Sequence, residues 1–317
     1  MTQIPARSTT ACKKGGNTVK DKRDLSDFQN VKKITGGMSG DDKYRVERDG
    51  KACLLRIADI GTYETKETEY AHLQHLNDFD LPVPECLAFG KTEDGAAVYT
   101  LLSWIEGEEA EKILPQTDAS RQYACGRQAG QILSQIHLCS PAVNASKSWY
   151  ERYFEVIEPR LEAYRKEGLP FEGCDDVLRF IEDNRDLLKT RPLCRHHGDY
   201  HMGNLIIHED KLWVIDWQTV DFENIGDPWY EFNRLGSEYP AFARGQIDGY
   251  FADAVPEEFW RLFALYFATS AITSIVWAKH WAPKELDGIM ALNRRVVEMF
   301  DYMRSPIPNW YREKEIK

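Results

Sequence analysis

The feature that most constrains the fold is a short polar motif followed by two apolar runs. The motif is His197-Gly198-Asp199-Tyr200-His201-Met202-Gly203-Asn204. The apolar runs, 205–207 and 212–215, are separated by Glu209-Asp210, and the second ends at Asp216. Two apolar runs split by charged residues are typical of a β-hairpin. We therefore expect a hairpin that returns Asp216 to the side of Asn204.

These residue types suit the transfer of a phosphoryl group. Asp199 offers a carboxylate that can accept a proton, and Asn204 and Asp216 offer oxygens for a divalent cation. Magnesium keeps several waters, so one carboxylate and one amide beside bound phosphates suffice. Protein kinases use H-R-D-x-x-x-x-N followed by a metal-binding Asp, and here Gly198 replaces the Arg. His-Gly-Asp alone also fits a loop with a capping Asp, but Asn204 and Asp216 favour a metal–phosphate site.

Composition limits the fold and the partners. The 317 residues, 43% of them hydrophobic, allow one large or two small domains with an ample core. A net charge of −11 argues against nucleic acid or an anionic membrane as the main partner and is compatible with a cationic substrate. The N-terminus lacks an apolar signal core, and the seven Cys form no C-x-x-C pair. These features predict a cytoplasmic protein with reduced thiols, and nothing in the sequence implies a protein partner.

The order of predicted elements indicates an α+β chain. Residues 1–26 are polar and predict a loose tail. Residues 27–106 alternate between strand patterns and one helical pattern, whereas residues 107–317 are mainly helical. Strands are expected at 31–35, 43–46, 52–58, 85–89 and 97–104, and helices at 63–77, 121–137, 151–165, 175–188, 256–280 and 286–304. The apolar stretch 262–278 contains Thr and Ser and predicts a buried helix of the larger lobe rather than a membrane span.

The smaller lobe contains candidate nucleotide-binding residues. The glycine-rich segment contains Gly36, Gly37, Ser39 and Gly40, whose backbone N–H groups could approach phosphate oxygens, although a tight hairpin fits equally well. Arg56 is the one cation in the apolar run 53–57, and Glu69 on the following helix is its expected partner, with Glu67 as the competitor. Ser103 and Ile105, in a segment that links the lobes, could meet an adenine edge through their backbone, although an ordinary edge strand also fits.

With these residues placed, the chain resembles the aminoglycoside phosphotransferase family, which shares its fold with choline kinases and protein kinases. The resemblance is sharpest in three segments: His197-Gly198-Asp199 through Asn204, Ile215-Asp216-Trp217, and Gly226-Asp227-Pro228-Trp229. It implies a protein-kinase-like two-lobe fold, with a small β-rich N-lobe and a large mainly helical C-lobe. It also implies that Asp199 orients or deprotonates a substrate hydroxyl, that Asn204 and Asp216 bind Mg²⁺, and that Asp227 braces the catalytic loop near His197.

The expected activity is transfer of the γ-phosphate of ATP or GTP to a hydroxyl of a small molecule. An aminoglycoside, or a related aminosugar or amino alcohol, is the expected acceptor, and an endogenous choline- or sugar-kinase-like substrate is the alternative. Asp221, Glu223 and Glu231 could meet its ammonium groups or could be ordinary solvated acids. A nucleotide-binding module without catalysis and a zinc hydrolase are the other classes, and the hydrolase would leave Asn204 and Asp216 unexplained.

Overall fold

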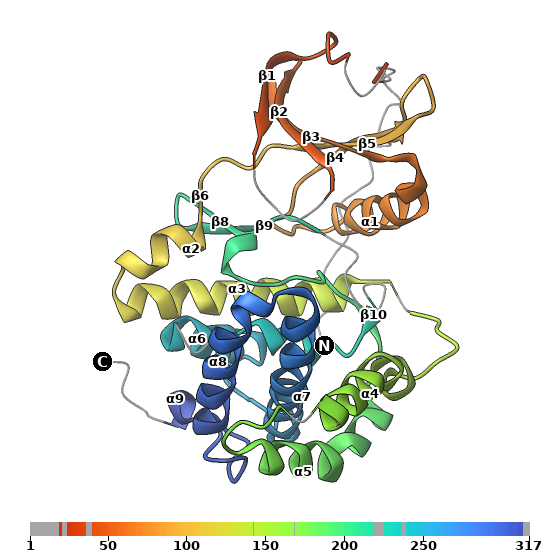
Figure 1. Cartoon of the computed structure of the whole chain (residues 1–317). Coiled ribbons are helices and arrows are strands. Elements are labelled where there is room, and N and C mark those ends of the chain that lie inside the picture. Colours follow the sequence, from red (N-terminus) through yellow and green to blue (C-terminus); the bar gives the residue numbers. More distant parts are fainter. Residues whose placement is uncertain are drawn as a thin grey trace. The chain divides into compact units, whose positions relative to one another are not determined.

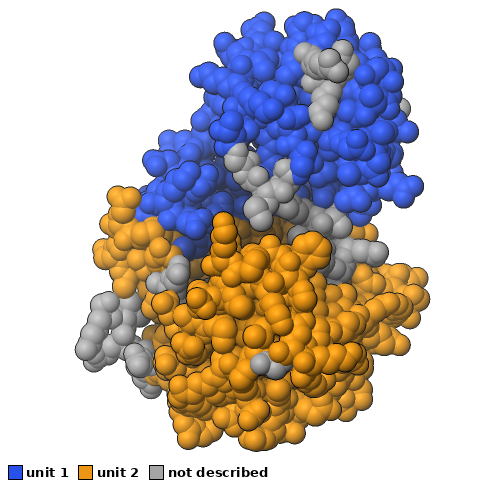
Figure 2. Space-filling model, viewed as in Figure 1, with its two compact units in different colours: residues 1–113, 138–140, 202–219 blue, residues 114–137, 141–201, 220–317 orange. Residues whose placement is uncertain are grey.

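The computed structural model describes residues 19–20, 24–35, 40–141, 143–167, 169–217, 225–235 and 239–312. The chain divides into two compact units, coloured separately in Figure 2. Unit 1 contains residues 1–113, 138–140 and 202–219, and unit 2 contains residues 114–137, 141–201 and 220–317. The polar motif is therefore shared: Asp199 belongs to unit 2, and Asn204 and Asp216 belong to unit 1.

Unit 1 contains an antiparallel five-stranded sheet with the order β1-β2-β3-β5-β4 (Figure 1). Its strands are β1 (Gln29–Ile34), β2 (Asp42–Arg48), β3 (Lys51–Asp59), β4 (Cys86–Lys91) and β5 (Ala97–Ser103). The β2–β3 turn is Asp49-Gly50, with φ values of 52° and 72°. Two successive left-handed residues match the twist of the flanking strands. A short 3-10 turn (Ile60–Thr62) leads from β3 into helix α1 (Tyr63–Leu76), which buries His72, Leu73 and Leu76.

A second sheet of unit 1 contains the predicted hairpin. Its strands, in the order β6-β8-β9, are β6 (Glu108–Glu109), β8 (Leu205–His208) and β9 (Lys211–Val214). Helix α2 (Ala110–Ile113) follows β6, and a 3-10 turn (Met202–Asn204) precedes β8. His208 pairs with Lys211, so Glu209 and Asp210 form the turn, with φ values of 47° and 66°. The hairpin is confirmed, although its turn has neither of the residues most typical of that geometry, Asn and Gly.

Unit 2 is mainly helical, which confirms the predicted α+β class. Its α-helices are α3 (Ala119–Cys139), whose last residues fall in unit 1, α4 (Trp149–Glu167), α5 (Cys174–Asn184), α6 (Pro240–Tyr250), α7 (Glu257–Trp281), α8 (Leu286–Met299) and α9 (Asn309–Arg312). Shorter 3-10 segments are Leu114–Gln116, Arg185–Thr190, Pro228–Arg234 and Pro283–Glu285. Strands β7 (Cys194–Arg195) and β10 (Ile225–Gly226) pair with each other, and in sequence they lie on either side of the polar motif 197–204.

Helix α7 is the central helix of unit 2. It packs against α4, α5 and α8, and it buries fifteen side chains, among them Phe259, Phe263 and Ile272. By length and composition α7 could also cross a membrane, but 83% of its most apolar window is buried inside the protein. Core helices of water-soluble proteins meet the same criterion. The burial of α7 agrees with the core helix that the sequence predicts for this stretch.

Candidate active site

Strand β3 presents Arg56 on the face of the sheet opposite the apolar core. Cys53, Leu55 and Ile57 belong to the buried core cluster of unit 1. Successive strand residues point to opposite faces, so Arg56 lies on the other side. Lys43 pairs directly with Arg56 across β2 and β3, which places both cations on that second face. The Arg56 side chain is only 8% exposed there.

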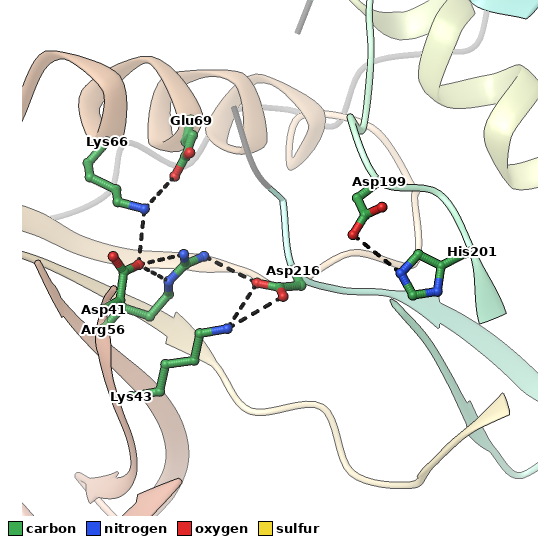
Figure 3. Close-up of polar contacts among 8 residues, drawn as sticks. All are labelled: Asp41, Lys43, Arg56, Lys66, Glu69, Asp199, His201 and Asp216. Atoms are coloured by element: carbon green, nitrogen blue, oxygen red, sulfur yellow. Dashed lines mark hydrogen bonds and ion pairs between the residues drawn. The ribbon is translucent and has the colours of Figure 1, made fainter. Parts of the chain in front are cut away.

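Arg56 is the centre of a chain of ion pairs (Figure 3). Its Nε and Nη2 atoms donate to Asp41 Oδ2 over 3.0 and 2.6 Å. The same carboxylate oxygen lies 3.0 Å from Lys66 Nζ, which also donates to Glu69 Oε2 over 3.3 Å. Arg56 Nη1 lies 3.6 Å from Asp216 Oδ1. Among the described contacts, Asp41 hydrogen-bonds directly to Arg56 and Glu69 binds Lys66. The charge of Glu69 also acts on Arg56, so its predicted partnership with Arg56 stays a prediction.

The ion pairs keep the buried members of this chain charged. Burial alone would raise the pKa of Asp41, but the charges and hydrogen bonds of Arg56 and Lys66 outweigh it and lower that pKa. Burial alone would lower the pKa of Arg56, but the charges of Asp41, Asp216 and Glu69 outweigh it and raise that pKa. Arg56 thus stays a fixed cation with a planar fork, which suits a phosphate group.

Asp216 accepts hydrogen bonds from a second cation. Lys43 Nζ lies 3.3 Å from Asp216 Oδ1 and 3.4 Å from Oδ2 (Figure 3). Asp216 itself has a left-handed backbone, with φ of 59°. Non-glycine residues in that region are uncommon, and they cluster at functional sites. The carboxylate that the sequence assigns to a metal is therefore aimed at positive charge.

The β8–β9 hairpin brings Asn204 and Asp216 to the same end. Leu205 pairs with Val214, and the Ile215 N–H donates to the Asn204 carbonyl over 2.9 Å. Asp216 is the next residue, so the predicted return of the chain is confirmed. One carboxylate and one amide are the hard oxygen donors that Mg²⁺ uses when phosphates complete its coordination. The donor chemistry therefore fits magnesium, and the two metal-binding roles stay predictions.

In unit 2, the loop that carries Asp199 has a constrained backbone. Gly198 has φ of 95°, which side-chain-bearing residues rarely adopt, so the glycine in place of the kinase Arg has a local reason. The Asp199 N–H donates to Nδ1 of the fully buried His197 over 3.2 Å. His201 Nε2 lies 3.3 Å from Asp199 Oδ2 (Figure 3), and the Asp199 side chain is 23% exposed. Asp199 is thus partly open, and His197 positions its backbone.

Glu231 is buried and holds the backbone of this loop, which corrects its assignment to substrate. Its side chain is buried, and it accepts the Gly198 N–H over 2.8 Å and the His197 N–H over 3.1 Å. His137 Nε2 lies 2.8 Å from the same carboxylate. Burial alone would raise the pKa of Glu231, but the hydrogen bond from His137 and the nearby imidazoles lower it to about 2. A carboxylate with these partners is not accessible to a substrate ammonium group.

Asp227 is a second buried brace. Its carboxylate accepts two hydrogen bonds of 2.9 Å from Arg191 and one of 2.6 Å from the Tyr266 hydroxyl. Its backbone carbonyl lies 2.9 Å from Nε2 of His196. Asp227 therefore meets the loop at His196, one residue before the expected His197. Asp227 holds the loop through the His196 ring and is itself held by the salt bridge to Arg191, rather than by a contact with Asp199.

The remaining predicted site residues are placed unevenly. Gly36, Gly37, Ser39, Asp221 and Glu223 lie outside the described residues. Gly40 is exposed, and a Cβ added there would meet no atom of the described residues within 4 Å. The Ser103 N–H donates to Glu85 O over 2.9 Å, and its hydroxyl accepts from the Glu85 N–H over 2.8 Å. Ile105 is half-buried. The roles of Gly40, Ser103 and Ile105 at a nucleotide stay predictions.

Five further residues take part in the polar clusters of unit 1 and unit 2 and were given no individual role from the sequence. They are Asp41, Lys43, Lys66, His137 and Arg191. Asp41 and Lys43 directly follow the glycine-rich segment, and that adjacency was a usable signal. Lys66 lies three residues before Glu69 on one face of a helix, and this spacing was a second usable signal. His137 and Arg191 come from distant parts of the chain and had no local signal.

Comparisons with known proteins identify the family and the fold. The family model described as "Phosphotransferase enzyme family" matches residues 30–263. No curated protein sequence matches the chain. Solved structures do match. Their sequence identity to this chain is low, so the match shows a shared fold. The aminoglycoside phosphotransferase APH(4)-Ia, in a complex with ADP and hygromycin B, has a TM-score of 0.58 and 15% identity over 86% of this chain and 94% of that one.

Two other matching solved structures are named for other small molecules. The streptomycin–ATP complex of APH(2")-IIa has a TM-score of 0.59 and 15% identity, and the match covers 86% of this chain and 92% of that one. A candidate fructosamine-3-kinase from Haemophilus somnus has a TM-score of 0.57 and 14% identity, with 85% of this chain and 92% of that one covered. Proteins with this fold are thus named for different acceptors: hygromycin B, streptomycin and fructosamine.

Proposed function

Because the chain belongs to the phosphotransferase enzyme family, we propose that it transfers the γ-phosphate of ATP or GTP to a hydroxyl group of a small molecule. The observation that carries this proposal is the hairpin end where Asn204 and Asp216 converge, with Asp216 facing Arg56 and Lys43. Metal-ligand oxygens and phosphate-binding cations on one unit are what a metal–nucleotide site needs.

Each residue has a chemical task in this proposal. Mg²⁺, when held by Asn204 and Asp216, would neutralise charge on the phosphates. Arg56, fixed by Asp41, offers a planar fork to phosphate oxygens. Asp199 accepts the hydrogen bond of the acceptor hydroxyl and orients its oxygen. Because the transition state of phosphoryl transfer is loose, positioning and charge stabilisation supply most of the rate.

The proposed acceptor is an aminoglycoside or a related aminosugar or amino alcohol. The net charge of −11 favours a cationic acceptor. Related folds bind hygromycin B and streptomycin. The candidate fructosamine-3-kinase keeps an endogenous sugar derivative as the alternative. Since Glu231 is engaged by the catalytic loop, Asp221 and Glu223 remain the acids proposed to meet the ammonium groups.

The test is a kinase assay on the purified protein with ATP or GTP and Mg²⁺. Acceptors would include aminoglycosides, simple aminosugars, fructosamines and choline, with the phosphorylated position read by ³¹P and ¹H NMR. Nucleotide binding without acceptor-dependent ADP release in any of them would favour the non-catalytic module. Activity that chelation abolishes and Zn²⁺, but not Mg²⁺, restores would favour the hydrolase class instead.

Asp199→Ala should separate chemistry from nucleotide binding. A positioned proton acceptor contributes about 10²- to 10⁴-fold, so we expect a loss of that size in kcat with the Kd of Mg·ATP unchanged. Asp186→Ala is the matched control, because this exposed carboxylate of the same unit pairs only with the surface residue Lys189 among the described contacts. If Asp199→Ala keeps turnover within about tenfold of the wild type, the role given to Asp199 is wrong.

A further inference from the structure

We propose that Lys43 is a second phosphate-binding cation of the nucleotide site, held on Asp216 until a divalent metal ion takes that carboxylate. The inference rests on the proposed function, because it assumes that a metal nucleotide binds beside Asp216. It adds a residue that neither the D-x4-N motif nor the apolar strand around Arg56 identifies.

The first argument is the cross-strand pairing of two cations. Lys43 and Arg56 are direct partners in the β2–β3 ladder, and their side chains are 13% and 8% exposed. Like charges directly opposite each other destabilise a sheet, the more so where water is scarce. Such a pair is tolerable when an anion lies between the two heads. In the structure that anion is Asp216, at 3.3 Å from Lys43 Nζ and 3.6 Å from Arg56 Nη1.

The second argument is the balance of charge. Among the described residues, the network links three cations and three carboxylates, namely Lys43, Arg56, Lys66, Asp41, Glu69 and Asp216. The charges of these six side chains sum to zero. A divalent ion bound to Asp216 would compete with the Lys43 ammonium for the same two oxygens. The phosphates that accompany the metal provide the anion to which the displaced ammonium can turn.

The third argument decides which cation moves. Arg56 is fixed by two hydrogen bonds to Asp41, at 2.6 and 3.0 Å. The Lys43 contacts with Asp216, at 3.3 and 3.4 Å, are longer. A lysine ammonium on a four-carbon stem also reorients more easily than a guanidinium held by its fork. Arg56 is therefore the fixed cation of the site, and Lys43 is the one that exchanges partners.

The test measures binding rather than turnover. In Lys43→Met, calorimetry should show Mg·ATP binding weakened by about tenfold, because a charge-assisted hydrogen bond to phosphate is lost. Binding of adenosine, which has no phosphate, should be unchanged. Mn²⁺ alone, followed by electron paramagnetic resonance, should bind several-fold more tightly, because no ammonium competes for Asp216. Lys43→Arg should retain most of the Mg·ATP affinity.

Lys33→Met is the matched control, since it removes an equal charge from neighbouring strand β1. Lys33 pairs with Asp42 at 2.9 Å, and its side chain is 58% exposed. We expect its affinities for Mg·ATP and Mn²⁺ to stay within about twofold of the wild type. Thermal melting of each variant reports whether the sheet is intact.

Opposite shifts for metal and nucleotide are the signature of partner exchange. If Lys43→Met binds Mg·ATP and Mn²⁺ as the wild type does, the inference is overturned while the nucleotide site stands. A loss of both affinities would also overturn it, since Lys43 would then merely support the site. A wild-type protein that binds no nucleotide would overturn the inference together with the proposed function.

Discussion

At the scale of single residues, the loop before Asp199 depends on two buried carboxylates with separate tasks. Glu231 accepts two consecutive backbone N–H groups, from His197 and Gly198. Asp227 neutralises Arg191 and holds His196 through its carbonyl. Buried carboxylates are tolerated only when hydrogen bonds and opposite charges compensate their desolvation. Both compensations are present, so the loop is braced at three successive residues.

Glu231→Gln should lower stability in a pH-dependent way. The folded pKa of Glu231 is about 2, below its ordinary value of 4.5. The stabilisation is therefore complete above about pH 4.5 and is lost as the pH falls towards 2. We expect the variant to unfold with on the order of 3 kcal/mol less free energy at pH 7, and the gap to close in acid. Urea unfolding between pH 2.5 and 7 measures it.

Glu182→Gln is the control for that experiment, because this carboxylate lies on α5 with 62% exposure. Its unfolding free energy should follow the wild type at every pH. A constant gap between wild type and Glu231→Gln across the whole pH range would contradict the ionised brace.

The sequence predicted some residues of the site because local patterns specify them. Arg56 was identifiable as a lone cation in an apolar strand, where strand alternation settles its face. The hydrogen bond from Arg56 to Asp41 was not identifiable, since Asp41 and Glu69 are both acids near the strand and only side-chain directions distinguish their roles. Glu231 was misassigned for a related reason. Its place in the 3-10 segment Pro228–Arg234 does not reveal which face meets the loop.

At the scale of elements, the β8–β9 turn has a backbone conformation that its two residues do not favour. Glu209 and Asp210 both have left-handed backbones, a conformation that Asn and Gly adopt more readily. Apolar runs on either side, rather than the turn, therefore determine this hairpin. This explains why the periodicity of 205–215 predicted it correctly without a turn signature.

Replacing Glu209-Asp210 by Asn-Gly should stabilise the protein. Two strained positions would be relieved in an exposed turn, so we expect a gain of about 0.5–1 kcal/mol in the free energy of unfolding. Chemical denaturation measures the gain. The same replacement at Arg48-Asp49, where only the second residue is left-handed, should not stabilise, because β2 still includes Arg48. A loss of stability at 209–210 would contradict the turn geometry.

Helices α3 and α6 approach each other through glycines on both sides. Gly126 and Gly130 of α3 face the backbone of α6, and Gly245 and Gly249 of α6 face the backbone of α3. A Cβ at these positions would lie only 2.0–2.2 Å from a carbonyl oxygen of the opposite helix. Glycines four residues apart share one face of a helix, so each helix presents a flat strip. The helices pack backbone to backbone.

Gly126→Ala or Gly245→Ala should therefore destabilise unit 2. Backbone carbonyls cannot move aside as a flexible side chain can, and we expect a loss of about 3 kcal/mol. Gly288→Ala is the matched control, because a Cβ there meets nothing within 4 Å and the residue lies within α8. Alanine favours helix over glycine, so this control should gain up to about 1 kcal/mol. Thermal unfolding distinguishes the two outcomes, and equal effects would contradict the close approach.

The same glycines explain why the sequence did not predict helix α6. Helix α6 contains Gly245 and Gly249, and glycine is a poor helix former. The Pro at its first position is a helix-start signal, but two glycines within only eleven residues give α6 a weaker local signal than the 21 residues of α3 or the 25 of α7. Tertiary packing against α3 supplies what the local sequence lacks. Long helices with continuous apolar faces were predicted because their local sequence alone indicates a helix.

At the scale of the whole molecule, the chain lacks the parts by which protein kinases are switched on by phosphorylation. Gly198 stands where those enzymes carry the Arg that reads an activating phosphate. Only residues 217–226 separate Asp216 from Asp227, and they contain no A-P-E sequence. With the loop instead held by Glu231 and Asp227, its geometry depends on buried groups that no kinase can modify.

We therefore expect an enzyme that is active as synthesised. Treatment with a broad-specificity phosphatase should leave kcat within about twofold, and mass spectrometry should find the active protein unphosphorylated. Thr219 is the one hydroxyl-bearing residue within 217–226, so Thr219→Ala should keep full activity. Asp199→Ala, assayed in parallel, is the reference for a large loss of kcat. If phosphatase treatment abolishes turnover and Thr219→Ala reproduces that loss, activation by phosphorylation governs this protein after all. The two buried carboxylates would then hold only one of two loop conformations.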